Sequence, residues 1–271
     1  MVSVHKLSLA AGDSVEVHDD GAHITSWRTA DGIERLFLSQ RSEFRPGVAI
    51  RGGVPIIFPQ FAGLGSLPKH GFARTSAWQR IAVANESPGT ALFRLQDSET
   101  TRAIWPQQFV ADYAIALNKD SLRLTLTIRN SGPQAFSFTA ALHTYLRVQD
   151  IDQVSIDGLQ GLRYRDSAGG DATVTEQAAA VRIVGEVDRI YFSTTKPIIV
   201  NEPGQRSVVC SEEGFADSVV WNPGTVKGAA LADMEADGYR RMLCVEAAAI
   251  ADPIMLQPGA AWSGTQLLMT Q

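Results

Sequence analysis

The chain has 271 residues, of which 45% are hydrophobic and 20% are charged, and its formal net charge is −5. This composition excludes a disordered, collagenous or coiled-coil chain, and the negative charge argues against nucleic acid or an acidic membrane as a partner. Large β-sandwiches of this length often form one domain, and the chain can bury a substantial core without disulfides or metal ions.

The cysteines and the N-terminal residues indicate the cellular compartment in which the protein resides. The two cysteines show neither CxxC spacing nor a disulfide framework, and the first residues contain no apolar signal-peptide segment. No apolar run approaches the roughly 18 residues that a membrane helix needs. We therefore expect a reduced, cytoplasmic protein with no membrane partner.

Apolar and polar residues alternate with a period of two along most of the chain. The pattern is clearest over 121–129, where four apolar residues share one face, as in an antiparallel strand that is buried on one side. Helical patterns are scarce, and only 175–183 and 229–236 are predicted as short helices in connections. Strands are predicted over 24–27, 91–95, 109–117, 121–129, 136–148, 197–200, 207–210, 218–221, 242–249 and 262–269.

Turns that contain Gly, Pro, Asn and Asp separate these strands. Many strands with few helices predict an all-β fold, a large antiparallel β-sandwich with a few short helices in connections. No linker, repeat or charge block divides the chain, and the glycine pair within 167–171 lies inside a continuing strand meander. We expect a single domain over 1–271.

The segment 51–74 departs from the strand pattern. It is rich in Gly and Pro and yet apolar, so it is unlike a solvated loop. A long irregular segment inside a compact domain is usually functional or disordered, and the Ile and Phe content argues against disorder. We expect it to pack across a sheet and to hold its polar residues at fixed points.

Several familiar motifs are absent from the sequence. Gly63-Leu-Gly65 lacks the third glycine of a dinucleotide fingerprint, and there is neither a GxxxxGK[ST] phosphate loop nor a GxSxG nucleophile elbow. The five histidines show no HxH or HExxH spacing. The sequence therefore predicts no cofactor, no metal and no covalent nucleophile.

His143 is a candidate general acid within the predicted strand 136–148. Alternation places its imidazole on the face opposite Phe136 and Phe138, among hydroxyl groups and a small alanine. An imidazole on such a face can donate a proton to a polar ligand. A hydrogen-bonded structural histidine is the alternative that the pattern leaves open.

Glu246 is a candidate general base within an apolar strand. A carboxylate there is expensive to bury unless it is paired or functional, and partial desolvation would raise its pKa. The three alanines that follow leave space for a ligand ring. A structural ion pair with Arg240 or Arg241 is the alternative.

Arg51, Lys69, His70 and Arg74 punctuate the apolar segment 51–74. Arginine offers a planar fork that matches phosphate, and neighbouring glycines let the backbone and an anion approach each other. These cations indicate an anion site within an acidic protein. Single cations at loop bends are otherwise usually solvated.

Asp188 and Trp221 complete the set of candidates. Asp188 precedes a predicted strand, where it can accept hydrogen bonds from hydroxyl groups or cap a turn. Trp221 can stack on a sugar face or fill the core.

Five fragments in a fixed order resemble a known family. They are RGGVPIIFPQF…LPKHGFAR, ALHTYLRV, VDRIYF, VVWNP and ADMEADGYRRMLCVEAA, and they extend from Arg51 to about Glu246. In this order they resemble the hexose-6-phosphate mutarotases, the glucose-6-phosphate 1-epimerase branch of the aldose 1-epimerase superfamily. The resemblance implies a galactose mutarotase-like supersandwich with its site on a concave sheet face.

The resemblance also implies a role for each candidate residue. It makes His143 the catalytic histidine and Glu246 the catalytic glutamate, while Arg51 and Arg74 hold the substrate phosphate and Asp188 binds the substrate. Two further residues belong to the same motifs: Lys69 occupies a substrate-contacting position where relatives commonly carry Gln, and His70 is expected near the sugar.

The reaction that the resemblance implies is interconversion of the α and β anomers of an aldohexose 6-phosphate. Glu246 takes the proton of the anomeric hydroxyl and His143 protonates the ring oxygen, from opposite sides of the pyranose. The opened sugar then closes on its other carbonyl face. The partner is a small sugar phosphate, and we expect a monomer. An aldose 1-epimerase acting on unphosphorylated sugars such as galactose and a non-catalytic sugar-binding sandwich are the alternatives.

Overall fold

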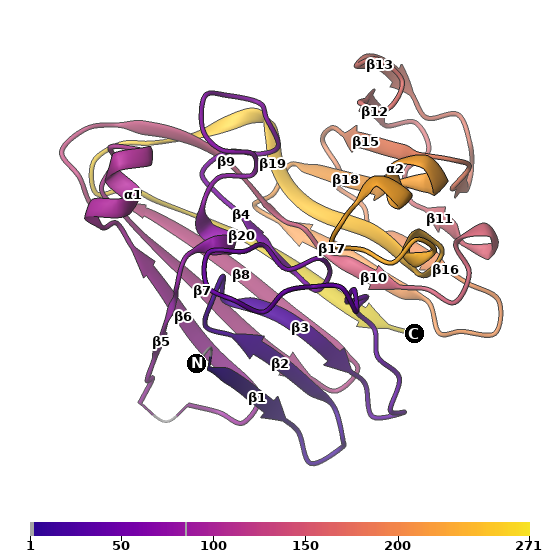
Figure 1. The fold of residues 1–271 in the computed structure, drawn as a ribbon, viewed down its shortest axis with the longest axis horizontal. Helices are drawn as coiled ribbons and strands as arrows, with labels where there is room; N and C mark the ends of the chain where they lie inside the picture. Colours follow the sequence, from indigo (N-terminus) through magenta and orange to yellow (C-terminus); the bar gives the residue numbers. More distant parts are fainter. Residues whose placement is uncertain (1–2, 85) are drawn as a thin grey trace.

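A computed structural model describes residues 3–84 and 86–271, and the chain forms mostly antiparallel β-strands, as predicted (Figure 1). Two large sheets pack face to face, and a three-stranded sheet near the N-terminus lies beside them. The three strands are β1 (Val4–Ser8), β2 (Ser14–His18) and β3 (His23–Arg28). Within the described ranges, no helix has the length and apolar character to cross a membrane.

The nine-stranded sheet forms one layer of the sandwich. In pairing order its strands are β14 (Val181–Arg182), β11 (Ser155–Asp157), β16 (Ile198–Asn201), β17 (Val208–Glu213), β20 (Ala261–Thr270), β8 (Ser121–Asn130), β7 (Phe109–Asn118), β6 (Thr90–Gln96) and β5 (Gln79–Ile81).

The eight-stranded sheet forms the second layer and carries the site. In pairing order its strands are β13 (Ala172–Thr175), β12 (Arg163–Asp166), β15 (Val187–Tyr191), β18 (Asp217–Asn222), β19 (Met242–Leu256), β9 (Phe136–Leu142) and β4 (Ile56–Ile57), and β10 (Tyr145–Arg147) also pairs with β19. Short helices lie in the connections: α1 (Glu99–Ile104), α2 (Gly224–Ala230) and the 3-10 turns η1 (Ala73–Thr75), η2 (Ile151–Gln153) and η3 (Gly238–Arg241).

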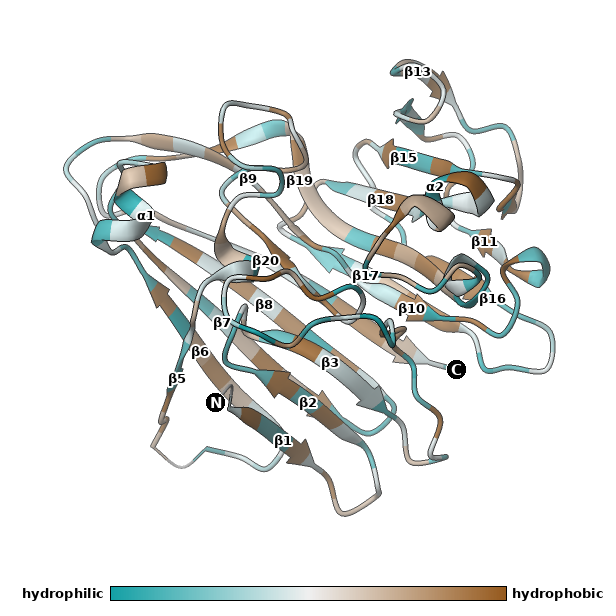
Figure 2. Cartoon of the chain, in the orientation of Figure 1, coloured by the Kyte–Doolittle hydropathy of each residue, from teal (hydrophilic) through white to brown (hydrophobic). Residues whose placement is uncertain are grey.

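The main core fills the space between the two large sheets. The alternation predicted for 121–129 is confirmed, because Leu122, Leu124, Leu126 and Ile128 of β8 are all fully buried in it. Figure 2 shows hydrophobic and hydrophilic residues alternating along the strands of these layers. This alternation is what a strand with one solvated face requires.

β19 is different because both of its faces are covered from Met242 to Ile250. Val245 and Ala247 face the core between the sheets, whereas Cys244 and Ala248 belong to a second apolar cluster on the other face. A strand that is buried on both sides has a nearly continuous apolar sequence. The site lies against this second cluster.

The segment 51–74 packs across the eight-stranded sheet, as predicted. Its residues Ile56 and Ile57 form β4 and pair with β9. Close backbone approaches hold it there: a Cβ on Gly53, whose φ is 62°, would lie 2.0 Å from the carbonyl oxygen of Ile24. Only glycine fits such a position.

The predicted helices are largely wrong. Residues 175–183 contain no helix: Thr175 ends β13, Val181 and Arg182 form β14, and the residues between them form a loop in which Glu176 contacts Arg189 and Tyr191 at 3.0 and 2.9 Å. The second helix occurs as α2, which begins at Gly224 and ends before most of the predicted range 229–236.

Two further differences concern elements that the period-two pattern does not resolve. Helix α1 was not predicted, although Ser98 and Thr101 form a reciprocal capping box at its start. The predicted strand 136–148 is interrupted, since β9 ends at Leu142 and β10 begins at Tyr145.

Candidate active site

A cavity of about 300 Å³ opens on the eight-stranded sheet, on the face that points away from the core between the two large sheets. It lies against β15, β18 and β19 and is bordered by the segment 51–74 and by α2. Six of the seven predicted site residues line it: Arg51, Lys69, His70, His143, Asp188 and Glu246. The fold therefore gathers residues that are up to 195 positions apart in the chain.

His143 and Glu246 meet because of strand register. β19 pairs with β9 at Ala247 and Leu142, and with β10 at Cys244 and Tyr145. The same register places His143 directly opposite Glu246. Opposite residues on one face of an antiparallel pair have Cβ atoms about 4.5–5.5 Å apart, so contact between the side chains follows from the pairing.

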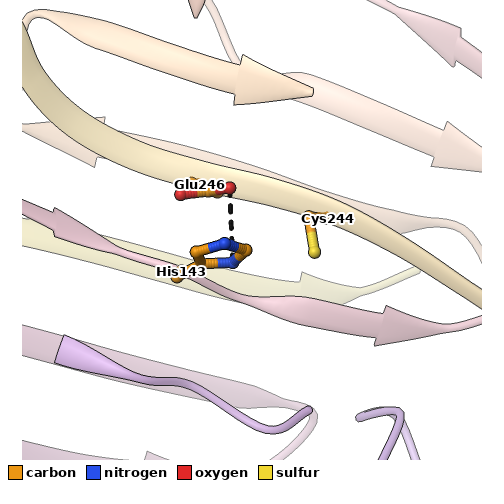
Figure 3. A group of neighbouring side chains, drawn as sticks. All are labelled: His143, Cys244 and Glu246. Atoms are coloured by element: carbon orange, nitrogen blue, oxygen red, sulfur yellow. Dashed lines mark ion pairs between the residues drawn. The ribbon is translucent and has the colours of Figure 1, made fainter. Parts of the chain in front are cut away.

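The two side chains form a buried pair on one wall of the cavity. His143 Nδ1 lies 3.3 Å from Glu246 Oε1 (Figure 3). They are therefore neighbours on one sheet, which corrects the expectation that they approach a sugar from opposite sides. The alternative of an ion pair with Arg240 or Arg241 is wrong: among the described residues Glu246 pairs with His143, and Arg240 pairs with Asp150 and Asp152.

Burial moves the pKa values of this pair in opposite directions. Desolvation raises the pKa of Glu246 well above its ordinary value, and the charge of Asp188 adds to the effect. Desolvation lowers the pKa of His143 well below its ordinary value, and His70, Arg74 and Arg51 add to that effect. Both shifts favour the uncharged form of the pair, in which the carboxyl keeps its proton and the imidazole gains none.

Aromatic rings fix the orientation of the His143 imidazole. It stacks on Tyr145 with the ring centroids 4.7 Å apart, and the edges of Trp221 and His70 contact it with centroid separations of 6.0 and 5.7 Å. Trp221 is nearly buried and lines the cavity, so it belongs to the core and to the site wall at once.

A buried glutamine supports the pair from the other sheet. Gln266 of β20 is 1% exposed; it accepts a hydrogen bond from Thr144 Oγ1 at 2.5 Å and donates one to the Val245 carbonyl at 3.1 Å. Thr144 follows His143 and Val245 precedes Glu246. The glutamine thus ties together the two backbone segments that carry the pair.

Arg51 is held at the edge of the cavity by two partners. Its Nη2 lies 3.0 Å from Asp233 Oδ2, and its Nη1 donates to the Tyr145 hydroxyl at 2.9 Å. No sequence signal linked Tyr145 or Asp233 to Arg51. Asp233 lies in the connection between α2 and β19, and only the fold brings it to Arg51.

Arg74 lies close to the pair but is not among the lining residues of the cavity. Across residues 3–84 and 86–271 it forms no ion pair, and its Nη2 donates only to the Lys69 carbonyl, at 3.3 Å. Its charge nevertheless influences the pKa values of His70, His143 and Glu246. Most of its N–H groups are therefore available to a ligand anion.

His70 has a defined donor and acceptor arrangement. Its Nδ1 accepts a hydrogen bond from the Ala62 amide at 3.3 Å, which leaves the proton on Nε2. Burial and the charges of Arg74 and Lys69 lower the pKa of His70 to about 3, so the ring is neutral. It can donate one hydrogen bond to a neutral or anionic ligand.

Asp188 lies within β15 rather than before a strand, and it lines the cavity. Burial raises its pKa, while the charge of Lys227 on α2 opposes the shift. Lys227 Nζ lies 3.9 Å from Asp188 Oδ2. Sequence reasoning missed Lys227, as it missed the polar rim residues Arg165, Ser167 and Asp171, which come from the 163–175 hairpin.

The fold and this cavity define a mutarotase-like β-sandwich, and comparison with known proteins gives the family. A model of the aldose 1-epimerase family matches residues 4–268. The chain belongs to that family. It is 38% identical over 262 residues to a protein of Cenchrus ciliaris named "Putative glucose-6-phosphate 1-epimerase", covering 92% of this chain and 79% of the relative.

Two further relatives agree. A protein of Escherichia coli K12 with the same name is 36% identical over 233 residues, covering 84% of this chain and 77% of the relative. A crystal structure described as "a putative mutarotase" from Salmonella typhimurium superposes with a TM-score of 0.91 at 28% identity, covering 99% of this chain and 90% of that one. The all-β supersandwich and the family expected from the sequence are both confirmed.

Proposed function

We propose that this chain is an isomerase that interconverts the α and β anomers of an aldohexose 6-phosphate, with His143 and Glu246 as its acid–base pair. The observation that carries the proposal is a buried imidazole–carboxyl contact of 3.3 Å on the wall of a cavity that also presents arginine. The names of the relatives support the substrate class.

Adjacent placement of the acid and the base suits this reaction. The anomeric hydroxyl and the ring oxygen are bonded to the same carbon, C1, so one pair on one wall can reach both atoms. Glu246 takes the proton of the anomeric hydroxyl while His143 gives a proton to the ring oxygen. The C1–ring oxygen bond breaks, C1 becomes an aldehyde, and closure after rotation about C1–C2 yields the other anomer.

The same pair can complete the transfer without separating charge. The 3.3 Å contact allows Glu246 Oε1 to pass its proton to His143 Nδ1 while Nε2 protonates the ring oxygen. Glu246 Oε2, which has no hydrogen-bond partner in the described chain, then receives the anomeric proton. A positioned acid or base of this kind typically contributes about 10²–10⁴-fold.

The arginines are proposed to bind the phosphate, remote from C1. Guanidinium groups bind phosphate through paired N–H donors. Arg74 has free donors, and Arg51 shares its charge with Asp233. Lys69 also lines the cavity and adds a positive charge, and Asp188 with His70 provides hydrogen bonds for the sugar hydroxyls.

The test is NMR exchange between the anomers of glucose 6-phosphate, measured with and without the protein and corrected for the spontaneous rate. We expect acceleration that depends on Glu246 and that is greater for glucose 6-phosphate than for free glucose or galactose. Equal acceleration of galactose would make this an aldose 1-epimerase of unphosphorylated sugars. The Arg51–Asp233 ion pair favours this alternative, because Asp233 offsets the charge that Arg51 would offer to a phosphate. Binding without acceleration would make it a sugar-binding sandwich.

A further inference from the structure

Cys244 brings a third metal-binding group to the His143–Glu246 pair. One ligand atom from each of the three residues lies within 4.8 Å of the other two, and all three residues are buried. Cys244 and Glu246 are two residues apart on β19 and share one face, and Figure 3 shows both side chains on the side of the strand where His143 lies. The linear spacing of the histidines gave no indication of this cluster.

We propose that His143, Cys244 and Glu246 form a binding site for a thiophilic divalent cation of the Zn²⁺ class, and that the bound ion blocks the acid–base pair. Binding of the ion stands on the geometry alone. The blocking effect rests on the function proposed above.

One buried atom of the cluster lacks any partner and a second has a single long contact, and both point to a ligand. Glu246 Oε2 forms no hydrogen bond with the described residues, and His143 Nδ1 has only its 3.3 Å contact with Glu246 Oε1, although both residues are buried. Buried polar atoms are normally paired, so an unpaired acceptor in a cavity wall is a position where a ligand gains free energy. A cation can use the lone pairs of both atoms at once.

The charge balance of the cluster favours a dication. A thiolate and a carboxylate together carry two negative charges, so a dication bound by Cys244, Glu246 and a neutral imidazole forms a cluster with no net charge. This matters because Arg51 and Arg74 face the cluster and would repel an added net positive charge, whereas Asp188 faces it with the opposite sign.

The donor set selects the kind of metal. A thiolate, an imidazole and a carboxylate are the usual ligands of Zn²⁺, and three protein ligands leave a fourth tetrahedral position for water or a sugar hydroxyl. Mg²⁺ and Ca²⁺ prefer oxygen ligands, so these ions should not compete. The bound ion would occupy the lone pairs that proton transfer needs.

Co²⁺ titration followed by absorption tests binding without reference to activity. A Co²⁺–thiolate bond gives a charge-transfer band in the near ultraviolet, and tetrahedral Co²⁺ gives intense visible bands. We expect a saturable signal in the wild type that Zn²⁺ displaces and Mg²⁺ does not. Cys244→Ser should abolish the thiolate band, and Cys210→Ser should keep it, because Cys210 is also a buried cysteine but lies on β17 outside the cluster.

Inhibition of anomer exchange by Zn²⁺ is the second readout. Cys244→Ser should exchange anomers as fast as the wild type, which also shows that it folds, and its inhibition constant for Zn²⁺ should rise at least roughly 10- to 100-fold. A wild type without a thiolate band, or a band that survives in Cys244→Ser, would overturn the site. Equal Zn²⁺ sensitivity of both proteins would overturn blocking at this cluster. A Cys244-dependent band in a protein that catalyses no exchange would leave the metal site standing and refute only the proposed enzyme.

Discussion

β8 and β19 are strands from the two layers of one sandwich, yet their sequences follow different rules. β8 alternates because only one of its faces is buried, so its polar residues from Ser121 to Arg129 face solvent, and the buried Asn130 at its end donates hydrogen bonds to the carbonyls of Gln134 and Leu256. β19 is buried on both faces from Met242 to Ile250, so solvent does not explain a polar residue within that stretch. A carboxyl in a strand that is buried on both faces costs free energy unless it is paired or functional. The position of Glu246 therefore points to a chemical role.

The largest effect should come from the carboxyl of β19. Glu246→Gln keeps the shape of the side chain but removes its proton transfer, and we expect the exchange rate of glucose 6-phosphate to fall roughly 10²- to 10⁴-fold. Glu212→Gln is the control, since Glu212 is a half-buried carboxyl whose pKa is also raised by desolvation, and it accepts a hydrogen bond from Ser218 outside the cavity. A comparable loss in the control would contradict the special role assigned to the carboxyl of Glu246.

The next effect concerns substrate selectivity. Arg74→Ala removes a guanidinium whose donors are largely free, and a lost charge-assisted contact of about 1.5–3 kcal/mol corresponds to roughly a 10- to 100-fold rise in KM for glucose 6-phosphate. The rate with free glucose should change little. Arg94→Ala, which breaks a surface ion pair with Asp112, is the control. If free glucose suffers as much, Arg74 supports the fold rather than the phosphate.

The pH dependence follows from the shared proton of the pair. The active form carries one proton, so activity should fall on the acidic side when His143 gains a second proton and on the alkaline side when Glu246 loses the last one. Because the pKa of His143 is lowered, the acidic limb should lie below pH 6.5; because the pKa of Glu246 is raised, the alkaline limb should lie well above pH 4.5. Each limb should change kcat about tenfold per pH unit. A single acidic limb with no alkaline limb would contradict one-proton sharing.

The smallest effect should come from the hydrogen bond between Thr144 and Gln266, which holds the backbone next to His143. Thr144→Val removes the hydroxyl bonded to Gln266 and leaves a buried amide oxygen without that donor, at a cost of about 1–3 kcal/mol in stability. We expect kcat to fall several-fold with KM nearly unchanged, and Thr144→Ser to restore kcat. A loss of thermal stability without any change in kcat would make the contact purely structural.

Sequence reasoning succeeded where one residue and its local pattern decide the outcome. Alternation assigned Phe138 to the core and His143 to the opposite face, and the burial argument singled out Glu246. It failed where the answer depends on which segments meet. Nothing local to Arg51 indicates Asp233, and nothing local to Thr144 indicates Gln266, because strand order and sheet packing bring each pair together.

The interruption of the strand at His143 and Thr144 shows the same limit. Alternation continues through both residues, so a single strand was the natural prediction, although the backbone leaves regular pairing between Leu142 and Tyr145. The faces were nevertheless correct, because the register across the break is preserved.

Because of that register, an insertion between β9 and β10 would separate His143 from Glu246, whereas an insertion between β18 and β19 would not. One residue added between Leu142 and Tyr145 would turn the imidazole toward the interior, since neighbouring positions on a strand face opposite ways. The connection between β18 and β19 can grow or shrink without such a penalty, because hydrogen bonds within the sheet, rather than the length of that loop, decide what lies across from Glu246. Homologues should therefore differ in length around α2 and agree in length between β9 and β10.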